Sequence, residues 1–266
     1  MYLDFYGFRE KPFSKTPDPR FLYMSRGHQE ALARLQYAVE ERELVLLTGE
    51  IGCGKTTLSR ALMDAMGESY RFCFIFNPRL TPLELLRTIA GSLGIVAPQR
   101  SKEDLLHELT EALYNLSQDG ICPVVVIDEA QLIPHREVFE EIRLLTNFQL
   151  DDRNLISLII MGQPELRKRL LHPVYEPLRQ RIGVNFHLPP LTLEETMEYI
   201  DARLEVSGGE PGIFTPDAVL RVYELSGGVP RRINLIATDA LLVGYGKDSP
   251  IIDASIIDEV REEMLI

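Results

Sequence analysis

Cysteine is scarce in this sequence, and the few cysteines present follow no recognisable pattern. Cys53, Cys73 and Cys122 are three among 266 residues, with no C-x-x-C pair and no histidine-rich ligand spacing. An odd, scattered set predicts neither a disulfide framework nor a zinc site. Reduced thiols are typical of the cytoplasm, so we expect a protein that folds without covalent cross-links.

Long apolar runs are also missing. A membrane-spanning helix needs about 18 or more consecutive apolar residues, whereas the longest runs here, 124–127 and 155–162, have the length of strands. Residues 1–6 lack the basic and apolar regions of a signal peptide. Internal repeats and low-complexity segments are absent from the sequence as well. We therefore expect the chain as given to be soluble and cytosolic.

Basic residues are outnumbered. The chain holds 28 Lys and Arg against 40 Asp and Glu, for a formal net charge of −12. This balance argues against broad, non-specific attraction to nucleic acid. Local basic clusters nevertheless occur at 167–169 and at Arg179 and Arg181. A DNA-binding groove in an assembled ring or filament therefore stays open as an alternative.

The sequence does contain a phosphate-binding loop at residues 49–56. GEIGCGKT fits the P-loop pattern G-x-x-x-x-G-K-[ST]. Residues 44–48 predict a short buried strand before it, and residues 57–63 predict the first turns of a helix after it. This order directs several backbone N–H groups and the positive end of a helix at one phosphate. We expect ATP to bind here, through Gly49, Gly52, Cys53, Gly54, Lys55, Thr56 and Thr57.

A second motif supports the first. The β-branched run 124–127 predicts a strand buried on both faces of a parallel sheet, and it ends in Asp128 and Glu129. Such sheets collect ligands at the carboxyl ends of their strands. Asp128 is expected to hold Mg²⁺ together with the hydroxyl of Thr56. Glu129 is expected to polarise the attacking water as a general base.

Strands and helices alternate over the first 190 residues, and only helices follow. Strand patterns occur at 44–48, 70–76, 124–127, 155–161 and 184–188. From Thr192 onward the pattern is helical, apart from the short pair 251–252. The predicted domains are an N-terminal arm at 1–26 that contributes to the nucleotide pocket, an α/β P-loop core at 27–190 and a helical lid at 191–266.

This layout resembles the AAA+ ATPases, in which a P-loop core with a parallel sheet flanked by helices precedes a small all-helical lid. The resemblance implies that Gln163, at the tip of the strand at 155–161, is sensor 1. Arg181 fits the arginine finger that a neighbouring subunit supplies, with Arg179 as second choice, because a planar, always-charged guanidinium suits the charge developing on a γ-phosphate. Arg231, early in a lid helix, corresponds to sensor 2.

Distinctive longer stretches point to a narrower group. They are very similar to the ExeA/GspA-type ATPases, whose members assist type II secretion, assembly of MSHA-like pili, or polysaccharide export. The matching stretches are YGFREKPF at 6–13, TPDPRFLY at 16–23, GQPEL at 162–166, ETMEYI at 195–200 and GVPRRIN at 228–234.

The narrower resemblance also carries expectations about place and pocket. It implies a cytoplasmic protein at the inner face of the bacterial inner membrane, attached through a partner or through a C-terminal segment beyond residue 266. It further implies that the N-terminal segment lies near the adenine, with Phe21, Leu22 and His28 as candidates. Core packing of an N-terminal arm explains the same composition equally well.

Three functions are compatible with these motifs. The favoured one is a self-associating ATPase that hydrolyses ATP at subunit interfaces and has a membrane-associated partner. Hydrolysis would drive assembly of a secretion, pilus or polysaccharide-export system. The expected catalytic residues are Lys55, Glu129, Gln163 and Arg181. The alternative is a DNA-associated AAA+ ATPase that regulates transposition. The third is a nucleotide-dependent switch that barely hydrolyses ATP, against which the intact Asp128-Glu129 pair argues.

Overall fold

The computed structural model describes residues 2–14, 19–95, 101–151 and 153–263. The chain forms two compact units. The first, the lid unit, comprises Met1–Gln29, Glu50–Thr57 and Pro189–Ile266, and the second, the sheet unit, comprises Glu30–Gly49 and Leu58–Leu188. The P-loop therefore clusters with the N-terminal arm and the C-terminal helices, whereas the strand that leads into it belongs to the sheet unit.

The sheet unit is built on five parallel strands in the order β2-β3-β4-β1-β5. The three inner strands are buried along their whole length, as the continuous apolar runs predict. β4 lies between β1 and β3, although β3 and β4 are separated from β1 in sequence. The strands are β1 (Leu44–Gly49), β2 (Tyr70–Ile75), β3 (Cys122–Ile127), β4 (Ser157–Gly162) and β5 (Ile182–Leu188).

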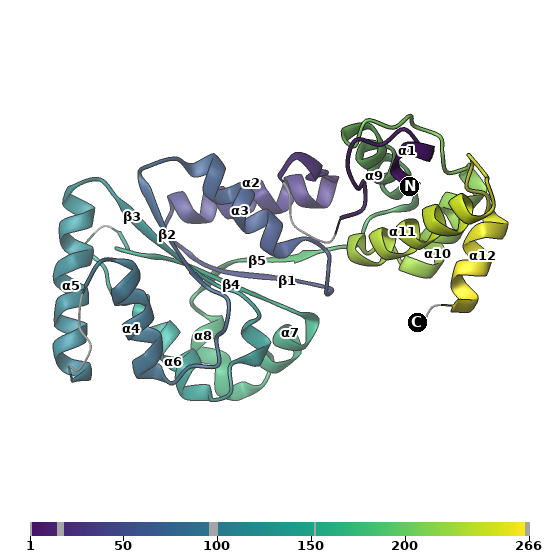
Figure 1. Ribbon diagram of the computed structural model, residues 1–266. Helices are drawn as coiled ribbons and strands as arrows, with labels where there is room; N and C mark the ends of the chain where they lie inside the picture. The colour runs from purple at the N-terminus through teal and green to yellow at the C-terminus, as the bar shows by residue number, and fades with distance from the viewer. Residues whose placement is uncertain (1, 15–18, 96–100, 152, 264–266) are drawn as a thin grey trace. The chain divides into compact units, whose positions relative to one another are not determined.

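Helices cover both faces of this sheet (Figure 1). α2 (Arg26–Glu40) and α3 (Lys55–Met66) lie on one face. The opposite face carries a core to which side chains of β1, β2, β3 and β4 contribute. Its helices and short turns are α4 (Pro82–Ser92), α5 (Lys102–Gln118), η2 (Ala130–Leu132), α6 (Arg136–Leu145), α7 (Pro164–Leu170), η3 (Pro173–Tyr175) and α8 (Glu176–Arg179).

Local sequence signals set several helix starts. Thr81 caps α4 and Ser101 caps α5, each with an acidic residue at the third helical position that bonds back to the cap. Both starts carry a cap pattern that is recognisable in the sequence. The short helices α7 and α8 were not predicted, because seven and four residues carry too little periodicity to be recognised.

The lid unit packs the N-terminal arm against four C-terminal helices. Tyr6, Phe8 and Phe13 are buried among them, so these aromatic side chains of the arm belong to the core of the lid unit. None of the helices in the described ranges is long and apolar enough to cross a bilayer. The elements are α1 (Tyr2–Phe5), η1 (Pro19–Phe21), α9 (Leu193–Val206), α10 (Pro216–Ser226), α11 (Pro230–Gly246) and α12 (Ala254–Glu263).

A buried arginine fastens the arm to the lid helices. Arg203 on α9 is 7% exposed, and its Nε donates to the carbonyl oxygen of Pro12 at 2.8 Å. Its guanidinium lies 5.0 Å from the ring centroid of Phe21 and also donates to Asn234 Oδ1 at 3.3 Å. A buried cation needs such partners because burial removes its water. The arm is thus held by directional bonds as well as by apolar packing.

Candidate functional site

At two positions the P-loop backbone adopts a conformation that strongly favours glycine. Gly52 has φ +87° and Gly54 has φ +96°, both in the region that other residues rarely adopt. A Cβ at Gly52 would lie 2.4 Å from the Cβ of Arg231, and one at Gly54 would lie 2.9 Å from His28 Nε2. These two glycines are therefore favoured both by the backbone conformation and by close packing within the lid unit.

Lys55 begins α3 at the end of this loop. Its side chain is 6% exposed, and its ammonium group donates to the carbonyl oxygen of Glu50 at 2.9 Å. Thr56 and Thr57 follow in the first turn and are half-buried. A buried ammonium at a helix N-terminus, beside a glycine cradle, is an arrangement suited to a phosphate. All the residues predicted for phosphate binding from Gly52 to Thr57 thus lie in one short segment.

Two neighbours from outside the loop bind its carbonyl groups. The backbone N–H of Arg231, in the first turn of α11, donates to Gly52 O at 3.3 Å. His28 Nε2 lies 2.9 Å from Cys53 O. Burial lowers the pKa of His28, with the bond to Cys53 and the charge of Glu195 acting against that shift. The predicted sensor 2 residue, Arg231, and His28 are therefore both in contact with the P-loop backbone.

Cys53 is a buried member of the loop. Its side chain is fully buried, and burial raises the pKa of its thiol. Reactive cysteines have lowered pKa values and partial exposure. The thiol of Cys53 has neither of these features in the structure.

Asp128 and Glu129 follow β3 in the sheet unit. Asp128 is 4% exposed, and its Oδ1 accepts the backbone N–H of Glu129 at 2.8 Å. Glu129 has φ +51°, a left-handed conformation that is unfavourable for a residue with a Cβ. Such conformations concentrate at functional sites.

The carboxylate of Glu129 is held by two glutamine side chains. Gln163 Nε2 donates to Glu129 Oε2 at 3.0 Å, and Gln131 Nε2 donates to the same oxygen. Gln131 Oε1 in turn accepts the backbone N–H of Gln163 at 3.1 Å. The structure therefore brings together Glu129 and Gln163 as predicted, and adds Gln131, which sequence reasoning missed. The only sign of it in the sequence was that Gln131, two positions after Glu129, is a polar residue.

Strand order explains why these side chains meet. β4 pairs with β1 on one side and with β3 on the other, all parallel. Their carboxyl ends therefore share one edge of the sheet, where α/β proteins bind ligands. Gly49, the last residue of β1, leads directly into the P-loop, and Asp128 and Gln163 are the first residues after β3 and β4.

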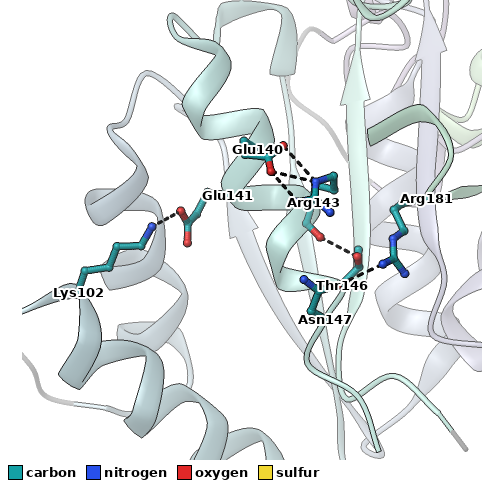
Figure 2. Close-up of polar contacts among 7 residues, drawn as sticks. All are labelled: Lys102, Glu140, Glu141, Arg143, Thr146, Asn147 and Arg181. Atoms are coloured by element: carbon teal, nitrogen blue, oxygen red, sulfur yellow. Dashed lines mark hydrogen bonds and ion pairs between the residues drawn. The ribbon is translucent and has the colours of Figure 1, made fainter. Parts of the chain in front are cut away.

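The two finger candidates differ in their surroundings. Arg179 is half-buried, and its Nη1 donates to Leu170 O at 2.6 Å and His172 O at 3.2 Å, at the end of α7. Arg181 is exposed, and its Nη2 donates to Asn147 Oδ1 at 3.3 Å (Figure 2). Arg179 is thus engaged in completing a helix terminus, which leaves Arg181 as the better placed of the two to meet a second molecule.

The basic cluster at 167–169 is partly occupied by internal packing. The guanidinium of Arg169 lies 4.8 Å from the ring centroid of Phe139, and its Nε donates to Tyr175 OH at 3.1 Å. It also donates to Ile133 O. Arg169 is therefore a structural cation of the sheet unit, and its charge is directed inward.

A hollow of about 420 Å³ lies elsewhere on the sheet unit and contains none of the predicted site residues. Glu141 lines it and is 3% exposed, with Lys102 Nζ 2.6 Å from its carboxylate (Figure 2). The remaining lining residues are Pro82, Arg136, Glu137, Phe139, Glu140, Leu144, Val174, Tyr175 and Leu178. We assign this hollow no part in nucleotide chemistry.

The residues present fit a nucleotide that brings its own metal ion. No group of three or more potential metal-ligating side chains occurs among the described residues. Mg²⁺ needs no such protein cage, because it retains waters and takes phosphate oxygens with one or two protein oxygens. A glycine cradle that a Cβ would fill and a buried carboxylate after β3 match that requirement.

For the adenine, Phe21 packs on Arg203 and Leu22 is half-buried, and their predicted role stays a prediction.

Residues 38–170 match the family described as AAA domain, a stretch that runs from the end of α2 through α7 and makes up half of the chain. General secretion pathway protein A from Aeromonas hydrophila is 42% identical over 253 residues, which cover 94% of this chain and 46% of that protein. The chain belongs to the AAA+ ATPases of the ExeA/GspA type. It is accordingly an ATP hydrolase, and it spans about half the length of this relative.

Solved structures support the same fold. Cdc6p from Pyrobaculum aerophilum superimposes with a TM-score of 0.69 at 20% identity, over 94% of this chain and 72% of that one. The RuvB branch migration motor of Thermotoga maritima gives 0.60 at 19% identity, over 92% and 73%. At these identities the likeness concerns the AAA+ fold alone. The predicted α/β P-loop core with a C-terminal helical region is thereby confirmed.

Proposed function

We propose that this AAA+ ATPase hydrolyses ATP at the interface between two copies of itself, and that hydrolysis drives assembly of a secretion, pilus or polysaccharide-export system. The observation that supports it best is the 42% identity to general secretion pathway protein A across 94% of the chain. The match takes in the P-loop segment, the sheet and most of the helical region. A membrane-associated assembly protein is the expected partner.

Phosphate binding falls to the P-loop in this proposal. Lys55 neutralises charge on the nucleotide, and the backbone N–H groups from Gly52 to Thr57 donate to its phosphate oxygens. Thr56 and Asp128 would hold Mg²⁺, which when bound neutralises charge on the phosphate oxygens. Asp128 suits this role because a buried carboxylate is a strong oxygen ligand for a cation.

Water activation falls to Glu129. As general base it accepts a proton from the attacking water, a contribution that is typically about 10²–10⁴-fold. Its carboxylate is oriented by Gln163 and Gln131, which bond to one oxygen, Oε2. The other oxygen, Oε1, is the one we assign to the water.

Completion of the site is assigned to a second subunit. Arg181 is exposed and therefore available to a neighbouring molecule, and a finger of this kind contributes about 10³–10⁵-fold to turnover in related phosphoryl transfer. Arg231 responds to the nucleotide from the lid, because its backbone bonds to Gly52 of the P-loop. Nucleotide state and the position of α11 are coupled in this proposal through that contact.

DNA remains the competing partner, and the structure weakens the case for it. Two of the arginines that suggested a DNA groove are engaged internally, Arg169 against Phe139 and Arg179 at the end of α7. The net charge of −12 also disfavours a polyanion. We therefore treat DNA binding as an outcome of the test below.

The test is the mass of the Glu129→Gln variant with Mg-ATP, measured with and without duplex DNA at physiological salt. This variant should keep ATP bound because it lacks the general base. A closed ring or small oligomer that is indifferent to DNA supports the proposal. Growth into filaments whose length follows the DNA would replace it with the transposition alternative. The Lys55→Ala/Glu129→Gln double variant is the matched control, and it should remain unassembled.

Interface hydrolysis has its own test, which uses two inactive variants. Arg181→Ala retains an intact P-loop, and Lys55→Ala retains an intact finger. Mixed in equal amounts, they should restore about a quarter of wild-type turnover, because that share of interfaces in a randomly mixed ring pairs an intact P-loop with an intact finger. Absence of restored turnover, with mixed oligomers verified, would contradict hydrolysis between subunits. Arg179→Ala is the comparison, and its main expected effect is on stability.

A further inference from the structure

His28 is a buried histidine beside the P-loop to which the mechanism above gives no role. It lies in the first turn of α2 and is 4% exposed. Its Nε2 is 2.9 Å from Cys53 O, and its Nδ1 is 2.7 Å from Ser25 Oγ. Buried polar groups are normally hydrogen-bonded, and here both ring nitrogens are. The orientation of the imidazole is therefore fixed from two sides.

The partners determine which ring nitrogen carries the proton. A carbonyl oxygen only accepts hydrogen bonds, so Nε2 donates its N–H to Cys53 O. Nδ1 is then the acceptor and takes the O–H of Ser25, whose oxygen also accepts the backbone N–H of His28 at 3.2 Å. One neutral tautomer thus satisfies every group in the chain Ser25–His28–Cys53, and burial, which lowers the pKa of His28, keeps it neutral.

The bond to Cys53 sets the direction of the next backbone N–H in the loop. A trans peptide group is planar, so its C=O and N–H point in opposite directions. Because His28 binds the carbonyl of Cys53, the N–H of Gly54 is turned away from α2. In a P-loop the inward backbone N–H groups are the ones that meet the phosphate.

The sequence of the loop matches this contact. Gly54 has φ +96°, and a Cβ on it would lie 2.9 Å from His28 Nε2. A side chain at this position would therefore push the imidazole away from Cys53 O. The second glycine of the motif serves the approach of His28 as well as the turn itself.

We propose that His28 is a positioning residue for phosphate binding, which holds the Gly54 N–H toward the nucleotide by binding the carbonyl oxygen of Cys53. It acts through the loop backbone and does not touch the phosphate. This inference rests on the proposed binding of nucleotide by the P-loop.

The test compares His28→Leu with His28→Gln by calorimetric titration of ADP, together with ATPase kinetics. Leucine fills a similar volume and has no donor, whereas the amide nitrogen of glutamine falls near the place of Nε2. His28→Leu should weaken ADP binding and raise the KM for ATP by about ten- to hundredfold, the range for one hydrogen bond to a charged group. The kcat at saturating ATP should change by less than about threefold, because the oriented N–H contributes to ground-state binding. His28→Gln should recover most of the affinity.

Two results would overturn the inference. One is His28→Leu binding ADP within about twofold of wild type. The other is equal weakening in His28→Leu and His28→Gln with equal loss of melting temperature, which would make the ring a packing residue only. Lys55→Ala separates this inference from the proposed function. If Lys55→Ala also binds ADP normally, nucleotide binding by the P-loop fails; if it loses ADP while His28→Leu does not, only the role of His28 is rejected.

Discussion

Replacing Gln131 with leucine should slow ATP hydrolysis without weakening nucleotide binding. Leucine preserves most of the volume but removes both polar groups of the amide. In the structure these groups make two bonds: Nε2 donates to the carboxylate of Glu129, and Oε1 accepts the N–H of Gln163 at 3.1 Å. None of the P-loop residues takes part in either bond, so the change is confined to the groups that orient water.

The magnitude follows from these two bonds. A hydrogen bond to a charged group contributes about 1.5–3 kcal/mol, and a barrier change of about 1.4 kcal/mol is tenfold in rate. If only the bond to Glu129 matters in the transition state, kcat should fall by about ten- to hundredfold. Loss of the second bond removes the acceptor of the Gln163 backbone N–H, which adds to this effect. The KM for ATP should stay within about twofold, because uniform binding is unchanged.

The assay is steady-state ATP hydrolysis with a parallel ADP titration, on Gln131→Leu and Gln131→Glu. Glutamate keeps an oxygen for the Gln163 N–H but places a second carboxylate beside Glu129. Its kcat should also fall, and should recover partly at low pH, where the two carboxylates can share a proton. Normal kcat in Gln131→Leu, with an unchanged melting temperature, would refute the assignment of Glu129 orientation to this residue.

Three further predictions concern stability. Gly52→Ala should destabilise the protein by at least about 1–2 kcal/mol, because φ at Gly52 is +87° and the new Cβ would lie 2.4 Å from the side chain of Arg231. The control is Gly246→Ala in α11, which has open space at its Cβ and should be neutral or stabilising by up to about 1 kcal/mol. Thermal melting of the two variants tests this difference. Lys102→Met should lower the free energy of unfolding in urea by about 1–3 kcal/mol. The change leaves the 3%-exposed carboxylate of Glu141 without this cation, and the 46% exposure of the lysine side chain keeps the loss below that of a fully buried pair. Adding Glu141→Gln should recover most of the loss, and equal loss in the single and double variants would contradict the reasoning. Burial lowers the pKa of His28 in the folded protein. Its neutral form therefore contributes stability above the unfolded-state pKa of about 6.5, and this contribution is lost as the pH falls through the folded-state pKa. The urea midpoint of His28→Gln should accordingly decline less below pH 6.5 than that of the wild type.

The P-loop and the acidic pair were predictable because each is a contiguous stretch of residues whose function is local. Residues 49–56 fit a pattern in which glycine, lysine and threonine each have a fixed backbone task. The helix caps at Thr81 and Ser101 were predictable for the same reason, since a cap involves residues only three positions apart. Gly54, which has φ +96°, is one of the fixed glycines of that pattern.

Contacts between distant segments were the part that sequence reasoning missed. Gln131 meets Gln163 only because β4 is inserted beside β3, a matter of strand order that no local pattern encodes. The bond of Arg179 to the end of α7 was not predicted either, and the preference for Arg181 as the finger, made from the sequence, stays a prediction.

By itself, the sequence determined that this chain has a nucleotide-binding P-loop, an acidic strand end and an AAA+ layout of sheet followed by helices. Those features arise from local periodicity and short motifs, whose physics is complete within a few residues. Only the tertiary structure decided that Gln163 bonds to the carboxylate of Glu129, that His28 bonds to the P-loop backbone, and that Arg203 fastens the arm to the lid helices. These contacts join residues from 25 to 191 positions apart, and they exist because burial forces polar groups to find partners wherever the packed chain brings them.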